Sequence, residues 1–182
     1  ARSLYKDISK VYPIVITRNL QKAKEWVRER AEDSEARYGV IASSRAKRLR
    51  AKGVWVECSC KPAKWFLKGK DDIKSSFAME EVATEFDIQG LEIDWAVVCW
   101  DADYRYMNGS FEYMEMSGSK WHNVNSVENR RYLQNAYRVL LTRARQGFVI
   151  FIPEGDANDV TREKAFYDGT YVYLKTIGVI EI

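Results

Sequence analysis

The stretch LLTRARQGFVIFIPEGD, from Leu140 to Asp156, joins a helix signal to a strand signal. It starts with the end of an apolar segment typical of a helix, passes through two arginines and a glycine, and continues into the apolar run Phe148–Ile152. An uninterrupted apolar run of this length is typical of a buried strand. Arg143 and Arg145 therefore bring fixed positive charge to the point where the chain enters the core of a sheet.

Two explanations account for this charge, and the residues alone leave both open. If the arginines end a helix, they interact favourably with the helix dipole, which contributes about 0.3–1 kcal/mol. That explanation requires positive charge but not arginine. If Arg143 instead faces a phosphate across a domain interface, arginine is the suitable residue, because guanidinium is always charged and bonds two oxygens at once.

The segment that contains these arginines, Asn125–Gly147, is the strongest helix signal in the chain. Its apolar residues recur at spacings of three and four. Asn125 and Glu128 have capping-box spacing, and Gly147 can end the helix. We therefore predict a helix that packs on the sheet and leads into the strand Phe148–Ile152.

Short β-rich runs alternate with amphipathic segments through the rest of the chain. Strands are predicted at Tyr12–Thr17, Tyr38–Ser43, Val54–Cys58, Glu81–Thr84, Trp95–Trp100 and Phe148–Ile152. Further helices are predicted at Asn19–Glu32, Ser44–Gly53 and Thr161–Gly178. This alternation favours an α/β fold, with three layers (αβα) around a mostly parallel sheet, in a single domain over residues 1–182. The aromatic and polar residues 101–124 predict a hairpin-like insertion.

The composition is ordinary for a globular domain of 182 residues, with 46% hydrophobic and 30% charged residues. A net charge of +3 does not by itself indicate a nucleic-acid binder. No apolar run approaches the ~20 residues of a membrane span, and no signal-peptide pattern appears, so we expect no membrane contact and a cytoplasmic location. Because the chain does not begin with Met, we expect it to be a piece of a longer protein.

Familiar catalytic and metal-binding patterns are absent from the sequence. The single histidine, His122, supports no Ser–His–Asp triad, and a zinc site at Cys58 and Cys60 would need about two more ligands. We therefore predict reduced thiols and no metal site. No phosphate loop of the form G-x-x-x-x-G-K-[ST] occurs, and no strand ends in a Walker B acidic pair. The chain cannot build a cradle for nucleotide phosphates alone.

The segment TEFDIQGLEID, Thr84–Asp94, places a glycine turn between two predicted strands. Loops at the carboxyl ends of strands bind ligands in open α/β sheets. Glu92 could accept a hydrogen bond from a ribose hydroxyl, and Gly90 lets a ligand approach the backbone closely. A turn with solvated polar residues explains the same segment, and the residues alone favour that simpler interpretation.

The segment Thr84–Asp94 and the opening stretch Leu140–Asp156 resemble motifs of superfamily 1 helicases. QGLEID (Gln89–Asp94) is similar to motif V, and VLLTRARQGFVIFIP (Val139–Pro153) is similar to motif VI, in the helicase order. The wider text, above all Val82–Asp103 and Asn135–Asp156, resembles the bacterial Schlafen-like (group 3) DNA/RNA helicase domain family. The resemblance covers nearly the whole chain.

This resemblance implies a RecA-like fold of the P-loop NTPase superfamily, with the insertion at 101–124 between motifs V and VI. It implies the C-terminal motor domain of an ATP-dependent DNA or RNA helicase or translocase, a hydrolase that is inactive as an isolated domain. The Walker A and B half would lie upstream and hold most of the ATP and Mg²⁺, so no cofactor is expected in this chain. The implied partners are DNA or RNA, single-stranded, and that upstream RecA-like domain.

On the nucleotide side, the resemblance assigns Arg143 to the motif VI arginine that reaches the γ-phosphate of ATP. Gln89, Gly90 and Glu92 match the part of motif V on the ATP side. Arg138 departs from the family pattern, in which many relatives carry Tyr or Asn, so the stacking or packing role of that position is not carried over. The departure leaves the role of Arg143 untouched.

On the nucleic-acid side, the resemblance assigns Thr84 to the strand-end position of motif V that faces the nucleic-acid backbone. YGVIASS (Tyr38–Ser44) resembles the motif IV region, which assigns Ser43 and Ser44 to phosphate contacts. The basic run Ser44–Lys52 has two explanations. A solvated helix face is favoured, and a salt-sensitive contact with a nucleic-acid backbone is the alternative.

The aromatic residues near motif V are predicted to pack in the core and the insertion rather than to stack on bases. They are Trp100, Tyr104, Tyr106, Tyr113 and Trp121. Two other function classes stay open. One is a helicase-like module that binds nucleic acid or protein without motor activity. The other, least favoured, is a Rossmann-like enzyme domain, for which the Gly-rich dinucleotide fingerprint is missing.

Overall fold

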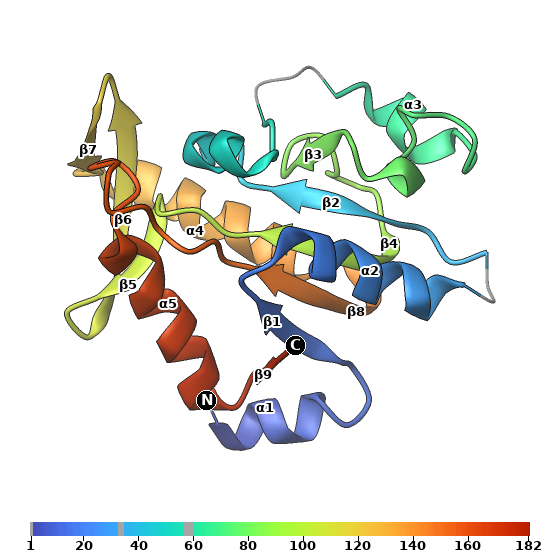
Figure 1. Ribbon diagram of the computed structural model, residues 1–182, viewed down its shortest axis with the longest axis horizontal. Coiled ribbons are helices and arrows are strands. Elements are labelled where there is room, and N and C mark those ends of the chain that lie inside the picture. Colours follow the sequence, from blue (N-terminus) through green and yellow to red (C-terminus); the bar gives the residue numbers. More distant parts are fainter. Residues whose placement is uncertain (1, 33–34, 57–59) are drawn as a thin grey trace.

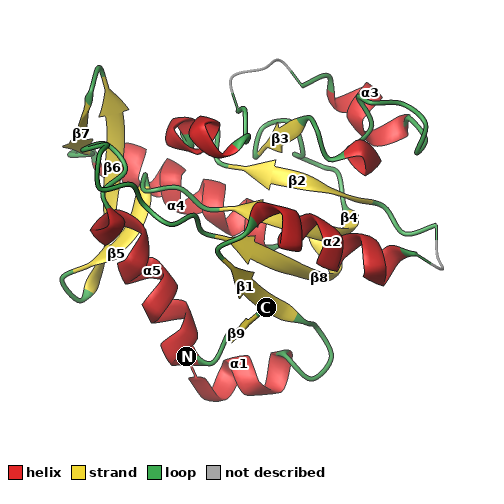
Figure 2. Cartoon of the chain, in the orientation of Figure 1, coloured by secondary structure: helices red, strands yellow, loops and turns green. Residues whose placement is uncertain are grey.

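The computed structural model of the protein describes residues 2–32, 35–56 and 60–182. Within these ranges, six strands form a parallel central sheet (Figures 1 and 2). Across the sheet the strands are β3 (Val82–Thr84), β2 (Tyr38–Ala42), β4 (Ile93–Cys99), β8 (Ala144–Phe151), β1 (Ile14–Thr17) and β9 (Ile180–Glu181). All carboxyl ends therefore meet at one edge of the sheet and all amino ends at the other.

Helices cover both faces of this sheet because its strands carry apolar residues on both sides. Along β4, Val98 faces one layer and Val97 the other. The first layer contains α4 (Val127–Leu141) and α5 (Lys164–Ile177), and the second contains α2 (Leu20–Ala31), which lies in front of the sheet in Figure 1. The predicted α/β fold, a parallel sheet between helical layers, is confirmed.

Shorter helices complete the layers. α1 (Arg2–Ile8) packs on α5. Trp65 of α3 (Pro62–Leu67) lies against Gly39 of β2, where a Cβ atom would come within 2.4 Å of the indole ring. A short 3-10 helix, η2 (Ser76–Ala78), follows. None of the helices in the described ranges is long and apolar enough to cross a membrane.

The insertion between β4 and α4 is a small antiparallel sheet. Its strands are β5 (Tyr104–Met107), β6 (Ser110–Ser117) and β7 (Lys120–Asn123). The predicted hairpin is therefore a three-stranded meander, which stands at the left of Figure 1 beside the carboxyl edge of the main sheet. Between ring centroids, Tyr104 lies 4.6 Å from Phe111 and 5.1 Å from Tyr137 of α4. The predicted packing role of the insertion aromatics is confirmed.

α4 is shorter at both ends than the predicted helix. It begins after Ser126, whose hydroxyl accepts a hydrogen bond from the backbone N–H of Asn129, rather than at Asn125. It ends at Leu141, because the chain turns there to pair with β4 as strand β8. A helical pattern that runs on into the start of a strand cannot be separated from it by periodicity alone.

The early start of β8 changes the position of two arginines. Ala144 pairs with Ile93 of β4, so the first half of β8 belongs to the sheet, and Gly147 lies inside the strand. Arg143 occupies the turn between α4 and β8, and Arg145 lies on β8 itself. The predicted position of both arginines at the end of a helix is wrong.

Two other segments differ from the prediction. The basic helix predicted at 44–53 is the 3-10 helix η1 (Lys47–Lys52). Residues 54–56 form no strand, and Cys58 lies outside the described residues, so the predicted strand Val54–Cys58 is not found in its described part. Cys60 and Cys99 are free cysteines.

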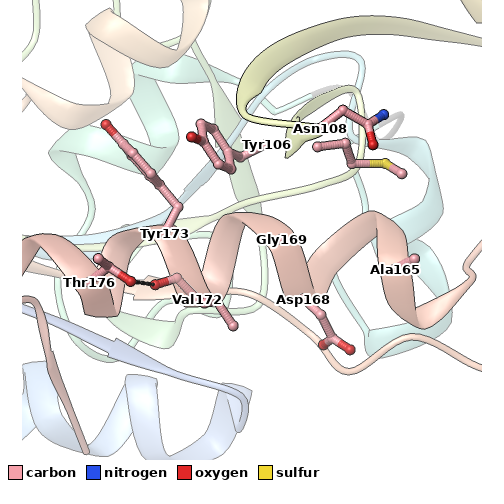
Figure 3. A pocket seen from close by; sticks show the side chains of 9 residues that line it. Tyr106, Asn108, Ala165, Asp168, Gly169, Val172, Tyr173 and Thr176 are labelled. Atoms are coloured by element: carbon pink, nitrogen blue, oxygen red, sulfur yellow. Dashed lines mark hydrogen bonds between the residues drawn. The ribbon is translucent and has the colours of Figure 1, made fainter.

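The docking of α5 on the insertion depends on Gly169. A Cβ atom at this position would lie 2.0 Å from the carbonyl oxygen of Tyr106, so no side chain fits. Figure 3 shows Gly169 on the side of α5 that faces Tyr106. Both residues line a surface cavity of about 560 Å³. Tyr173, one helical turn further along α5, stacks on the Tyr106 ring at a centroid distance of 4.3 Å.

We expect Gly169→Ala to lower the free energy of unfolding by about 1–2 kcal/mol, because overpacking costs more than the helix propensity of Ala returns. Val172→Ala is the control, since Val172 lines the same cavity but is 59% exposed. Chemical denaturation of the two variants measures the difference. A Gly169→Ala variant as stable as the unsubstituted protein would show that this close approach does not hold α5 in place.

Candidate nucleotide and nucleic-acid interface

The predicted site residues fall at both edges of the main sheet. Ser43, Ser44 and Thr84 follow or end strands β2 and β3 at the carboxyl edge, and Arg143 precedes β8 at the amino edge. The loop of residues 85–92 starts at the carboxyl end of β3 and reaches the amino end of β4. Its last residues therefore do not lie at the carboxyl edge, where we expected this loop to bind ligands.

At the amino edge, the structure brings Arg143 together with the end of this loop. The backbone N–H of Ile93 donates to the Arg143 carbonyl at 3.2 Å, and Nη1 of Arg143 donates to the Leu91 carbonyl at 3.4 Å. Glu92 and Gly90 are exposed, and a Cβ atom on Gly90 would meet nothing within 4 Å. Two predicted segments that are far apart in sequence thus form one open surface.

The charge of Arg143 is not neutralised by any carboxylate in the described part of the chain. No carboxylate forms an ion pair with it within residues 2–32, 35–56 and 60–182. Its Nε is buried and has no hydrogen-bond partner in those ranges. A buried guanidinium N–H without a partner is costly, and an anionic ligand would satisfy it.

Arg145 has a different environment. Its Nη2 donates to Oδ1 of Asp94 at 2.7 Å, and Gln146 donates to the same oxygen. The backbone N–H of Arg37 donates to Oδ2 of Asp94. Burial alone would raise the pKa of Asp94, but the hydrogen bonds from Arg145, Arg37 and Gln146 outweigh burial and lower it. Arg145 therefore has a carboxylate partner, whereas the described residues give Arg143 none.

At the carboxyl edge, two of the predicted hydroxyl groups are bonded to buried or local carboxylates. Ser43 is fully buried and donates to Oδ2 of Asp103 at 2.8 Å. Thr84 is nearly buried, and both its hydroxyl and its backbone N–H donate to Oδ2 of Asp87. A nucleic-acid phosphate would have to replace these carboxylates to bind either hydroxyl.

Ser44 is the most accessible of the three predicted nucleic-acid residues. Its backbone N–H and its hydroxyl donate to the two carboxylate oxygens of Glu85, each at 2.7 Å. This two-pronged contact is one that a phosphate group can form equally well. Glu85 therefore occupies, within the same chain, the place that the sequence predicts for a phosphate.

A buried acidic pair lies at the same carboxyl edge, and the sequence-based prediction missed it. Asp101 and Asp103 follow β4 and are almost fully buried. Tyr167 donates to Asp101 at 2.9 Å, and Tyr137 donates to Asp103. Burial, and then the neighbouring charge of Asp101, raises the pKa of Asp103 to about 7. The signal was the sequence WDAD directly after an apolar strand.

These bonds give the acidic pair a structural role. Through Ser43, Tyr137 and Tyr167 it connects β2, α4 and α5 to the end of β4. Across the described part of the chain, no three His, Cys, Asp or Glu side chains are grouped so that they could hold a metal ion. The residues described therefore fit no Mg²⁺ site of their own.

The basic run after Ser44 is only partly solvated. Arg48 donates to Asp159 at 2.8 Å, and the guanidinium of Arg50 lies 4.0 Å above the ring of Trp55. Nη1 of Arg45 is buried and has no hydrogen-bond partner in the described ranges. The favoured explanation of a solvated face is therefore incomplete, because two of these arginines are bound to other parts of the protein.

The comparison with protein families matches most of this chain to a known family. The family model described as Schlafen group 3, DNA/RNA helicase domain, matches residues 1–154. The match includes the main sheet from β1 to β8, both predicted motifs and the insertion, and it ends before α5. Neither the comparison with curated proteins nor that with solved structures found a match.

The acidic pair predicts a pH dependence of stability. The pKa of Asp103 is about 7 in the folded protein and 3.8 ordinarily. At pH values between these two, folding therefore takes up a proton. The free energy of unfolding should therefore fall as the pH rises from about 4 to about 7, by up to about 1.4 kcal/mol per pH unit. Denaturant titrations across this range measure it.

Asp103→Asn should reduce this slope, and the buried Asp101, whose pKa burial also raises, should keep part of it. Asp94→Asn is the matched control, because the pKa of Asp94 is lowered and its titration contributes little in this range. The same slope in Asp103→Asn as in the unsubstituted protein would rule out Asp103 as its source.

Proposed function

Because the chain belongs to the Schlafen group 3 DNA/RNA helicase domain family, we propose that it is the C-terminal RecA-like motor domain of an ATP-dependent helicase or translocase. We further propose that it belongs to superfamily 1, that it acts in the bacterial cytoplasm, and that residues 1–182 are one domain with an insertion at 101–124. One observation carries the proposal. Arg143 stands beside the motif V loop at an open edge of the sheet, with no carboxylate partner among the described residues.

On this proposal, a preceding RecA-like domain carries the phosphate loop and holds ATP with Mg²⁺ against the amino edge. ATP supplies the phosphoryl group that is transferred to water. Arg143 compensates the negative charge that develops on that group. Glu92 accepts a hydrogen bond from the ribose, and Gly90 allows close approach to the backbone. The proposal also assigns Gln89 to the nucleotide side of motif V.

The proposed nucleic-acid contacts lie at the opposite edge. Ser44 is the best placed for a phosphate, since its two donors already hold a carboxylate. Ser43 and Thr84 would contact a single-stranded DNA or RNA backbone after exchanging Asp103 and Asp87 for the ligand. The loop of residues 85–92 runs between the two edges, so that movement at one edge is transmitted to the other.

We expect no ATP turnover by this chain alone, because it has no phosphate loop and no metal cluster in its described part. Phosphate release with Mg²⁺, with and without single-stranded DNA or RNA, measures this. Turnover by the isolated chain that a substitution within it abolishes would contradict the two-domain proposal.

In the protein that includes the upstream half, Arg143→Ala should reduce ATP turnover by about 10³–10⁵-fold, as loss of an arginine finger does. Arg143→Lys should restore little, because an ammonium group cannot make the two-pronged contact. Stability should change by no more than about 1 kcal/mol, since among the described residues the side chain makes one long hydrogen bond.

Arg145→Ala is the control for charge, because Arg145 is bonded to Asp94. Arg145→Ala should lower the melting temperature and leave ATP turnover close to that of the unsubstituted protein. Equal losses of turnover in Arg143→Ala and Arg145→Ala would refute the arginine-finger role. A protein that binds nucleic acid but shows no ATP turnover would instead support the alternative function, a helicase-like module without motor activity.

A further inference from the structure

A groove of about 480 Å³ lies between α4 and the loop of residues 85–92. One wall is a face of α4 that includes Tyr132 and Asn135, and the other is the loop with Phe86 and Gln89. Ser44 and Arg45 line it as well. Its volume is within the range of sites that hold small molecules or single groups of a larger ligand.

Two aromatic rings in this groove face solvent. Phe86 is 70% exposed and Tyr132 is 60% exposed. Neither ring is stacked on another ring or on a cationic side chain among the described residues, in contrast to Tyr104 and Tyr106 of the insertion. Exposed aromatic rings that line a groove are typical of a binding site.

The polar groups of the groove suit a ligand with both a flat ring and a phosphate. The side-chain amides of Gln89 and Asn135 belong to exposed residues and can both donate and accept hydrogen bonds. Arg45 has a buried Nη1 without a partner in the described ranges. The two donors of Ser44 already hold the carboxylate of Glu85.

We propose that this groove binds one unpaired base of a single-stranded nucleic acid. The base stacks on the exposed rings of Phe86 and Tyr132, and the amide of Asn135 contacts its edge. The phosphate of the same nucleotide replaces Glu85 at Ser44. The inference rests on the proposed function, since it defines a subsite within the proposed nucleic-acid interface.

The position of the groove gives this subsite a consequence for the motor. Phe86 belongs to the same loop as Leu91, whose carbonyl accepts a hydrogen bond from Arg143. A base that binds Phe86 therefore contacts the loop that holds the arginine side chain. Binding of the strand and the position of Arg143 are linked through a single short segment.

Fluorescence anisotropy with this chain at low salt tests the subsite. The probes are a labelled oligothymidylate and an abasic strand with the same number of phosphates. The unsubstituted protein should bind the base-bearing strand about tenfold more tightly, since stacking of one base contributes on this scale. Phe86→Ala and Tyr132→Ala should each remove most of that preference and leave binding of the abasic strand unchanged.

Val127→Ala is the matched control, because Val127 is 71% exposed on α4 but does not line the groove. It should bind both strands as the unsubstituted protein does. Glu85→Gln should strengthen binding of both strands, because it removes the charge that competes for Ser44. Unchanged affinity in Glu85→Gln would overturn the phosphate part of the inference.

The base subsite would be overturned if the unsubstituted protein bound both strands equally or bound neither. It would also be overturned if Phe86→Ala weakened binding of both strands to the same extent. Unchanged binding in both aromatic variants would do the same and would fit a groove for a partner protein. The arginine finger is tested separately, because Arg143→Ala should keep the base preference. If Arg143→Ala keeps the base preference and does not lower ATP turnover, only the proposed motor function is refuted.

Discussion

The hydrogen bond from the Ile93 N–H to the Arg143 carbonyl joins the two segments on which the site depends. It lies at the start of the parallel pairing between β4 and β8, the two central strands. Because this pairing begins so early, α4 must end at Leu141, and Arg143 is left in a turn beside the loop of residues 85–92. The arrangement of the amino edge follows from the register of the core.

The two edges of the sheet differ in how their polar groups are satisfied. At the carboxyl edge, the hydroxyls of Ser43 and Thr84 are bonded to carboxylates of the same chain, and the insertion packs over the end of β4. At the amino edge, the Arg143 side chain donates to the Leu91 carbonyl and forms no ion pair within the described residues. The hydroxyls of Ser43 and Thr84 are thus satisfied without a ligand, whereas the guanidinium of Arg143 is not paired with a carboxylate among the described residues. This difference is the physical basis of our proposal that the nucleotide lies at the amino edge.

Sequence patterns predicted most of the sheet, because five of its strands are apolar runs bounded by turns or helices. The roles of the two arginines could not be separated in the same way. Arg145 acquires its partner Asp94 only through the pairing of β4 with β8, a contact between distant parts of the chain. The pair Asp101 and Asp103 was missed because its burial depends on Tyr137 and Tyr167, which arrive from α4 and α5. Tertiary contacts, rather than local preference, decided these positions.

We propose that the amino edge, and not the carboxyl edge, faces the nucleotide. Photocrosslinking tests it directly, with an ATP analogue that carries a photoreactive group on its γ-phosphate and a protein that includes the upstream half. The account predicts labelled peptides that contain Arg143 or residues 89–92. Labelling of the peptides with Ser44 or Thr84 instead, or no labelling within this chain, would contradict it.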